Sequence, residues 1–139
     1  MPNIEKEVII LDKIYITPLL KAQKVFNQAL TEVKSELEKW AKKVEDPEVA
    51  EEFEGYDKTL QLSFPDIGVH LQLIIRDQKG RVEEGLNENA EMSLEVESDL
   101  FMGICTGEVD PMEAFMDGQL KPKGNMADLE VLEVFMDDL

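Results

Sequence analysis

The chain contains one histidine and one cysteine among its 139 residues, and neither has a partner at a spacing that would make it reactive. His70 falls on the polar side of an alternating segment, and the spacing of the sequence fixes no serine, cysteine or second histidine beside it. Cys105 falls on the apolar face of a helical pattern, where a thiol behaves as a small hydrophobic group. We therefore expect a surface role for His70, a structural role for Cys105, no catalytic residues and no enzymatic activity.

The 31 acidic residues form no motif that would hold a metal ion. The sequence has no CxxC pair, no HExxH helix and no Asp-x-Asp-x-Asp-Gly loop. Gly103 and Gly107 lie in a helical pattern and do not follow a strand, so no phosphate-binding loop is indicated. The formal net charge of −17 repels phosphate backbones. We expect no metal, no cofactor and no nucleic-acid partner.

The methionines are the one anomaly of composition, because six of the seven lie between residues 92 and 136: Met92, Met102, Met112, Met116, Met126 and Met136. Methionine is unbranched and polarizable, and it lines surfaces that must accommodate varied shapes. Two interpretations stay open on composition alone. The methionines form an ordinary core, or they line an adaptable cavity for an aliphatic or sterol-like ligand.

The first element that must position these residues is a long amphipathic helix. Thr17-Pro18 fits a helix start, and the apolar positions that follow recur at steps of mostly three and four: Leu19, Phe26, Leu30, Val33, Leu37, Trp40 and Val44. The opposite face is rich in lysine. From residue 18 to 44 the helix would be about 40 Å long, so it would overhang a domain of this size. Its stripe either packs across the chain's own sheet or forms a dimer seam. Residues 4–16 fit a strand or a helix.

A short second helix is expected before Gly55, and four alternating segments then predict strands over residues 60–64, 69–75, 81–86 and 91–97. Short turns favour consecutive antiparallel hairpins, giving a sheet with one apolar face and one acidic face. Ser98, Asp110 and Asn125 are suited to begin three further helices, and residues 119–121 to form a last strand. This order is typical of an α+β domain.

From Tyr56 onward the chain resembles the sterol carrier protein type-2 domain family, also called sterol-transfer domains. The segments TLQLSF…VHLQLIIRD and ENAEMSLEVESDLFMGICTGEVDP carry part of the resemblance, and DPMEAFMDGQLKPKGNMADLEVL carries most of it. The most specific positions fall at the helix ends of the family: Gly107, Asp110-Pro111, Ala114-Phe115, Gly118, Leu120, Lys121 and Gly124. The long lysine-rich helix departs from the family's first helix.

The resemblance implies an α+β fold with a five-stranded, mostly antiparallel sheet covered on one face by helices that enclose an apolar tunnel. The long amphipathic helix would precede it in a single domain over 1–139, with 1–16 an extension, 17–55 helical and 56–139 the part of strongest resemblance. Mapped onto this sequence, the tunnel walls of the family suggest the following ligand-binding residues: Leu71, Leu73, Met92, Leu94, Phe101, Met102, Cys105, Met112, Phe115, Met116, Leu120, Leu132, Phe135 and Met136. The last helix would act as a lid.

The implied function is non-enzymatic binding and transfer of a fatty acid, a fatty acyl-CoA or a sterol-like lipid. The alternatives are an interaction module that works through the long helix and a non-catalytic subunit that presents lipid to a partner enzyme. The lysine-rich helix could make transient membrane contact or form a homodimer. The single cysteine and the absence of a basic, apolar leader favour a cytoplasmic location.

Overall fold

The computed structural model describes residues 17–136, so the segment 4–16 discussed above lies outside the described residues. The elements are α2 (Thr17–Val44), η2 (Ala50–Phe53), β1 (Lys58–Phe64), β2 (Val69–Arg76), β3 (Lys79–Glu84), β4 (Met92–Glu95), α3 (Ser98–Cys105), α4 (Pro111–Met116), β5 (Lys121–Lys123) and α5 (Met126–Met136). The predicted order of helices and strands is confirmed. Only the strand ends differ, by a few residues, most visibly at β5.

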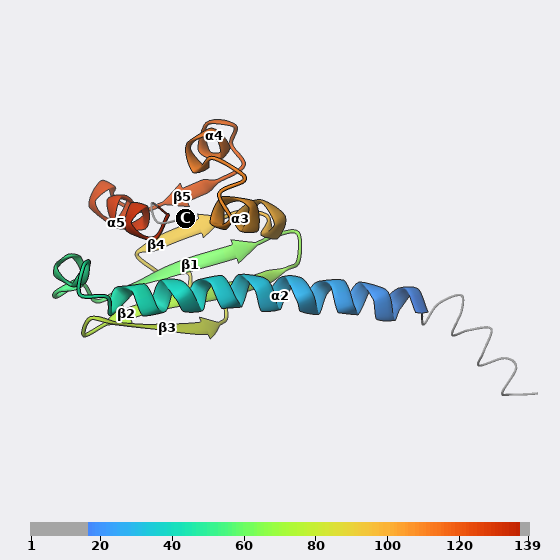
Figure 1. Ribbon diagram of the computed structural model, residues 1–139, viewed down its shortest axis with the longest axis horizontal. Coiled ribbons are helices and arrows are strands. Elements are labelled where there is room, and N and C mark those ends of the chain that lie inside the picture. Colours follow the sequence, from blue (N-terminus) through green and yellow to red (C-terminus); the bar gives the residue numbers. More distant parts are fainter. Residues whose placement is uncertain (1–16, 137–139) are drawn as a thin grey trace, which may run out of the picture.

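The helix α2 runs along the sheet and extends beyond it at its N-terminal end (Figure 1). Its apolar stripe is buried in the C-terminal half, where Leu37, Trp40 and Val44 belong to the core. The stripe therefore packs across the chain's own sheet. At the overhanging end Leu19 and Val25 are exposed.

The sheet has the strand order β3-β2-β1-β4-β5. β1 pairs antiparallel with β2, β2 with β3, and β4 with β5, whereas β4 pairs parallel with β1, with Leu60 opposite Met92. The prediction of consecutive hairpins is therefore wrong for β4. After the edge strand β3, residues 85–91 cross the sheet, so that β4 lies beside β1. Both edges of β1 are therefore paired, and β1 lies in the middle of the sheet.

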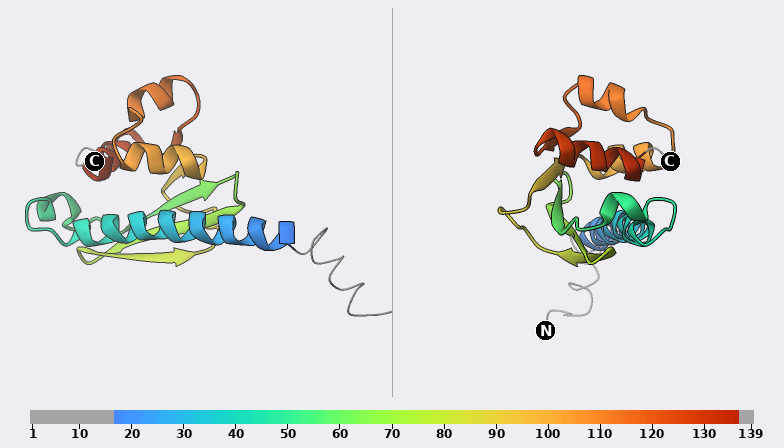
Figure 2. Two further views of the ribbon diagram at one scale, coloured as in Figure 1. Left: turned by 45° about the vertical axis from the view of Figure 1, so that its right-hand side comes forward. Right: turned by 90° about the vertical axis from the view of Figure 1, so that its left-hand side faces the viewer.

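One face of this mixed sheet is apolar, as the alternation predicted. Cross-strand neighbours share a face, so Leu60, Leu62, Leu71, Leu73 and Leu94 all point to one side, and all are buried. The helices α2, α3 and α5 lie on that side, while the sheet curves away on the other (Figure 2). The apolar layer between the sheet and these helices is the core of the domain.

The opposite face is polar and is partly covered by the crossover segment. Gln61 is buried there, because its amide donates to the carbonyl oxygens of Leu71 and Gly85, and its Oε1 accepts from the backbone N–H of Asn87 at 2.5 Å. These bonds satisfy a buried amide that would otherwise be costly. They also fix the path of the chain from β3 toward β4.

Side-chain caps begin two of the C-terminal helices as predicted. Asp110 accepts from the backbone N–H of Met112 at 2.9 Å to start α4, and Asn125 accepts from that of Asp128 at 2.8 Å to start α5. Ser98 does not cap α3 with its own side chain. It is the first helical residue, and its N–H and hydroxyl both donate to Asp66 in the turn between β1 and β2. A distant carboxylate therefore takes the place of the local cap.

The packing of α2 on β3 allows no side chain at Gly80. A Cβ added there would lie 2.6 Å from the backbone Cα and O of Ala41, so the helix or the strand would have to move. We expect Gly80→Ala to lower the free energy of unfolding by about 1–3 kcal/mol in urea titrations. The neighbouring exposed change Lys79→Ala should stay within about 0.5 kcal/mol of the wild type. Equal stability of both variants would contradict this packing.

Candidate functional site

Most of the predicted ligand-binding residues meet in the apolar layer over the sheet. Those buried in one continuous cluster are Leu71, Leu73, Met92, Leu94, Phe101, Leu120, Leu132 and Phe135. Met102 and Cys105 are half-buried at its margin. The side chain of Met136 lies outside the described residues, although its backbone ends α5. The sheet face, α3 and α5 thus face one another as the family resemblance implied.

Three predicted residues lie elsewhere, because α4 presents its large side chains to solvent. Met112, Phe115 and Met116 are all exposed, Phe115 by 52% and Met116 by 77%. Of the six residues of α4, all of them described, Ala114 alone is buried. The structure therefore does not bring these three side chains into the layer, and α4 stands away from the sheet (Figure 2).

Aromatic rings fill the centre of the layer. Trp40 of α2 stacks on Phe135 of α5 with centroids 5.1 Å apart and planes 7° apart, and it meets Phe101 of α3 at 5.5 Å. Phe135 also contacts Phe53 at 5.6 Å, and Phe101 contacts Phe64 of β1 at 5.4 Å. The rings join all three covering helices to the sheet. The predicted set omitted Trp40, although the apolar stripe of α2 already singled it out.

The indole of Trp40 carries a polar atom that its surroundings do not satisfy. The residue is 2% exposed, and within the described part of the chain its Nε1 has no hydrogen-bond partner. A buried donor without an acceptor costs about 1–3 kcal/mol, so such groups are rare in folded proteins. The centre of the layer is therefore apolar with one free N–H.

An ion pair between a buried aspartate and a partly exposed lysine links the first turn of α5 to β1. Lys58 Nζ lies 2.6 Å from Asp128 Oδ1, and the hydroxyl of Tyr56 donates to the same oxygen at 2.8 Å. Burial alone raises the pKa of Asp128, but the hydrogen bonds from Lys58 and Tyr56 outweigh it and hold that pKa below its usual value. Burial and the Asp128 carboxylate raise the pKa of Tyr56, which stays a donor.

The thiol of Cys105 at the margin of the layer is half-buried. Burial, followed by the nearby carboxylate of Glu36, raises the pKa of its thiol to about 12. We expect alkylation by iodoacetamide at pH 8 to be at least about a hundredfold slower in the folded protein than in urea, as followed by mass spectrometry. Equal rates in both conditions would show that α3 does not shield the thiol.

His70 lies outside this layer, on the polar face of β2. It is exposed, as expected, and its Nδ1 lies 2.9 Å from the hydroxyl of Ser63 on β1. The pair joins two strands on the side of the sheet that the helices leave open.

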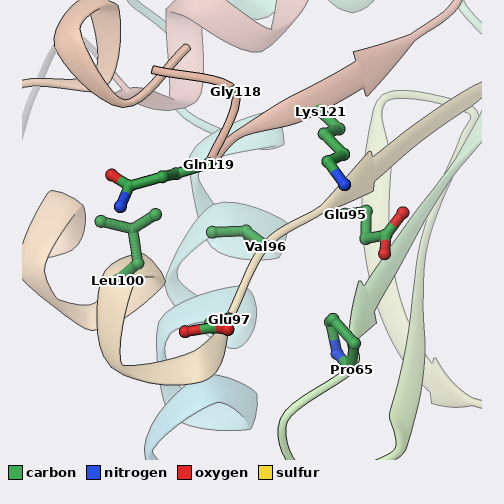
Figure 3. Close-up of a pocket in the computed structure, with 8 residues that line it drawn as sticks. All are labelled: Pro65, Glu95, Val96, Glu97, Leu100, Gly118, Gln119 and Lys121. Carbon is green, nitrogen blue, oxygen red and sulfur yellow. The ribbon is translucent and has the colours of Figure 1, made fainter.

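Two open pockets flank the layer. The first holds about 290 Å³ beside the end of β4 and the start of α3 and is drawn in Figure 3; it is lined by Pro65, Glu95, Val96, Glu97, Leu100, Gly118, Gln119 and Lys121. The second holds about 450 Å³ between α2 and the ends of β2 and β3; it is lined by Phe26, Leu30, Gly68, Val69, His70, Glu84 and Gly85. None of the fourteen predicted residues lines either pocket. Carboxylates stand in both walls, which suits a hydrocarbon poorly.

The part of the chain that the structure describes contains no helix with the length and apolar character needed to span a membrane.

Comparison with known proteins gives both a family and a fold. The model of the SCP-2 sterol transfer family matches residues 26–137, a longer stretch than the segments that carried the resemblance. A crystal structure of sterol carrier protein 2 is 20% identical with a TM-score of 0.51, and the match covers 74% of this chain and 95% of that one. A structure named UbiJ-SCP2, a ubiquinone synthesis protein, is 14% identical with a TM-score of 0.55, covering 88% and 94%.

One similar fold occurs inside a much larger enzyme. The sec-alkylsulfatase Pisa1 from Pseudomonas sp. is 24% identical with a TM-score of 0.50, and the match covers 58% of this chain. This chain spans only 13% of the length of that enzyme. No curated protein sequence matches the chain.

The five-stranded mixed sheet, its helix-covered apolar face and the family match over residues 26–137 lead to one conclusion: the chain belongs to the SCP-2 sterol transfer family, a family of lipid-binding and lipid-transfer domains.

Proposed function

We propose that the chain is a non-enzymatic carrier that holds one long apolar lipid between its sheet and the helices α3 and α5. The observation that carries the proposal is the continuous apolar layer, in which the sheet face, Phe101 and Phe135 lie together under the cover of two helices. The buried polar side chains that the structure describes lie outside this cluster and are Thr59, Gln61, Ser98 and Asp128. Such a layer can hold a hydrocarbon but offers it no reacting group.

In this structure the side chains of α5 fill part of the layer that we propose for the lipid. Leu132 and Phe135 point into the layer from the C-terminal half of α5, while Asp128 fastens its first turn to Lys58. An outward swing of the helix about that fastened end would withdraw both side chains and open the layer. In this proposal α5 is the lid that the family resemblance implied, and it would turn about its first turn, which the ion pair between Lys58 and Asp128 holds in place.

The driving force would be transfer of the hydrocarbon from water or membrane into the layer, about 0.8 kcal/mol for each buried methylene group. Affinity should therefore rise with chain length until the layer is full. The exposed apolar side chains of α4 could receive the lipid first, because Met112, Phe115 and Met116 lie together on one short helix and methionine adapts to varied shapes.

The ligand classes we propose are the fatty acid, fatty acyl-CoA or sterol-like lipid already considered. Native mass spectrometry of the purified protein should show one bound lipid per chain. A fluorescent fatty-acyl probe should bind and be displaced by long-chain competitors better than by short ones. Absence of both a co-purified lipid and probe binding would refute the carrier function.

A second function is favoured by the overhang of α2. Leu19, Leu20 and Val25 are exposed on it, and the second pocket lies where α2 leaves the sheet. A homodimer or another helical partner would bury these side chains, and Lys21 and Lys24 beside them could contact an anionic membrane.

Val25→Asp is the suitable test, because Leu37 lies in the core and its replacement would unfold the domain. Sedimentation that shows one monomeric species for wild type and variant at all concentrations would exclude self-association.

A further inference from the structure

The buried indole N–H of Trp40 points to the chemistry of the ligand. Trp40 lies at the centre of the layer, stacked on Phe135 of α5 and tilted against Phe101 of α3, and its Nε1 has no acceptor in the described part of the chain. The stacking at 5.1 Å on Phe135 fixes the ring, so the indole cannot turn toward a distant acceptor while α5 is closed.

A bound water would not complete this site. A buried water needs two to four polar partners, and the described side chains in ring contact with Trp40 are apolar. The buried carboxylate of Asp128 is already bonded to Lys58 and Tyr56. No described residue supplies an acceptor to Trp40 Nε1, and a molecule that enters the layer would supply one.

We infer that the carried lipid has a neutral oxygen, a hydroxyl or a carbonyl, that accepts a hydrogen bond from Trp40 Nε1; this inference rests on the proposed carrier function. A carboxylate fits the position poorly, because an ion in an apolar layer needs a paired charge, and the described side chains in ring contact with the indole are those of Phe101 and Phe135. The surplus of acidic residues over the rest of the chain also disfavours an anionic ligand. Among the proposed classes, a sterol-like alcohol or a lipid ester fits better than a free fatty acid.

The first test compares hexadecanol, hexadecanoate and hexadecane, delivered from cyclodextrin, as competitors of a bound fluorescent probe. In the wild type, hexadecanol should bind about 5- to 30-fold more tightly than hexadecane and more tightly than hexadecanoate. Trp40→Phe keeps the ring and removes the donor, so it should abolish the preference for the alcohol over the alkane. Phe135→Leu removes ring volume but keeps the donor, so it should preserve that preference. Equal affinities for alcohol and alkane in the wild type, or an unchanged ratio in Trp40→Phe, would overturn the inference.

The second test needs no substitution, because Trp40 is the one tryptophan of the sequence. Its indole ¹H–¹⁵N signal is a single resolved peak, and a new hydrogen bond should move the proton signal downfield. Hexadecanol should produce this shift and hexadecane should not, although both bind. Binding of both ligands with the same small shift would overturn the inference but leave the carrier function standing. Binding of neither would overturn both.

Discussion

Replacement of Phe135 by alanine should lower the free energy of unfolding by about 3–5 kcal/mol, among the largest effects of any single change in this domain. Phe135 is 1% exposed and touches both Trp40 and Phe53, so its removal leaves a void between α5 and α2. Urea unfolding followed by circular dichroism measures the loss. The matched control is Phe115→Ala, the same chemical change on exposed α4, which should stay within about 0.5 kcal/mol of the wild type.

Lipid binding by Phe135→Ala distinguishes a movable α5 from a helix that is an ordinary part of the core. If Phe135 occupies the place of the lipid, its removal leaves less to displace, and the lipid should bind Phe135→Ala more tightly than the wild type. A lipid at 100 times its dissociation constant should then return about 2.7 kcal/mol of the lost stability. Weaker binding by Phe135→Ala, with Phe115→Ala unchanged, would contradict the proposed movement of α5.

Replacement of Lys58 by methionine should also lower stability by about 3–5 kcal/mol at pH 7. The Asp128 side chain is 2% exposed, and without Lys58 it would be a buried carboxylate whose hydrogen-bond donor among the described residues is Tyr56. Asp128→Asn is the milder change, since Lys58 is 32% exposed and can turn to solvent, and we expect a loss of about 1–2 kcal/mol. A larger loss in Asp128→Asn than in Lys58→Met would contradict this asymmetry.

The contribution of Asp128 to the free energy of unfolding should depend on pH with opposite signs in the wild type and in Lys58→Met. In the wild type the pKa of Asp128 lies below its unfolded value of about 3.9, so its contribution is complete above that value and is lost as pH falls through the folded pKa. In Lys58→Met the lysine no longer offsets the effect of burial, so the pKa of Asp128 should rise. The deficit of the variant should therefore shrink as the pH falls through this raised pKa toward the unfolded value, and a deficit that stays constant from pH 7 to pH 4 would contradict the proposed role of the Lys58–Asp128 pair.

Periodicity and local caps predicted much of the fold because they depend on neighbouring residues. The stripe through Leu37, Trp40 and Val44 predicted α2, and Asp110 and Asn125 predicted the starts of α4 and α5. The parallel pairing of β4 with β1 could not be predicted from periodicity and local caps. It depends on the crossover held by Gln61, and buried strands with apolar alternation look alike in either direction.

The candidate site was predictable where the family motif and burial coincide. Leu94, Phe101 and Phe135 meet in the layer as expected. Periodicity was misleading for α4, because Met112, Phe115 and Met116 share one face of the helix in the pattern of a buried stripe, whereas the structure buries Ala114 and leaves that face exposed. Composition likewise left the role of the methionines open, and the structure divides them: Met92 is buried, while Met112, Met116 and Met126 are exposed.

Quenching of Trp40 by a long-chain alcohol that carries bromine in mid-chain measures directly whether a lipid enters the layer between α2 and α5. The emission should fall in a saturable way, complete at one alcohol per chain. The control moves the reporter to the exposed position 86 in the double variant Trp40→Phe, Leu86→Trp, whose emission should not change. Binding of the alcohol at this ratio with the emission of Trp40 undiminished, or equal quenching at both positions, would place the lipid outside the layer and contradict the account.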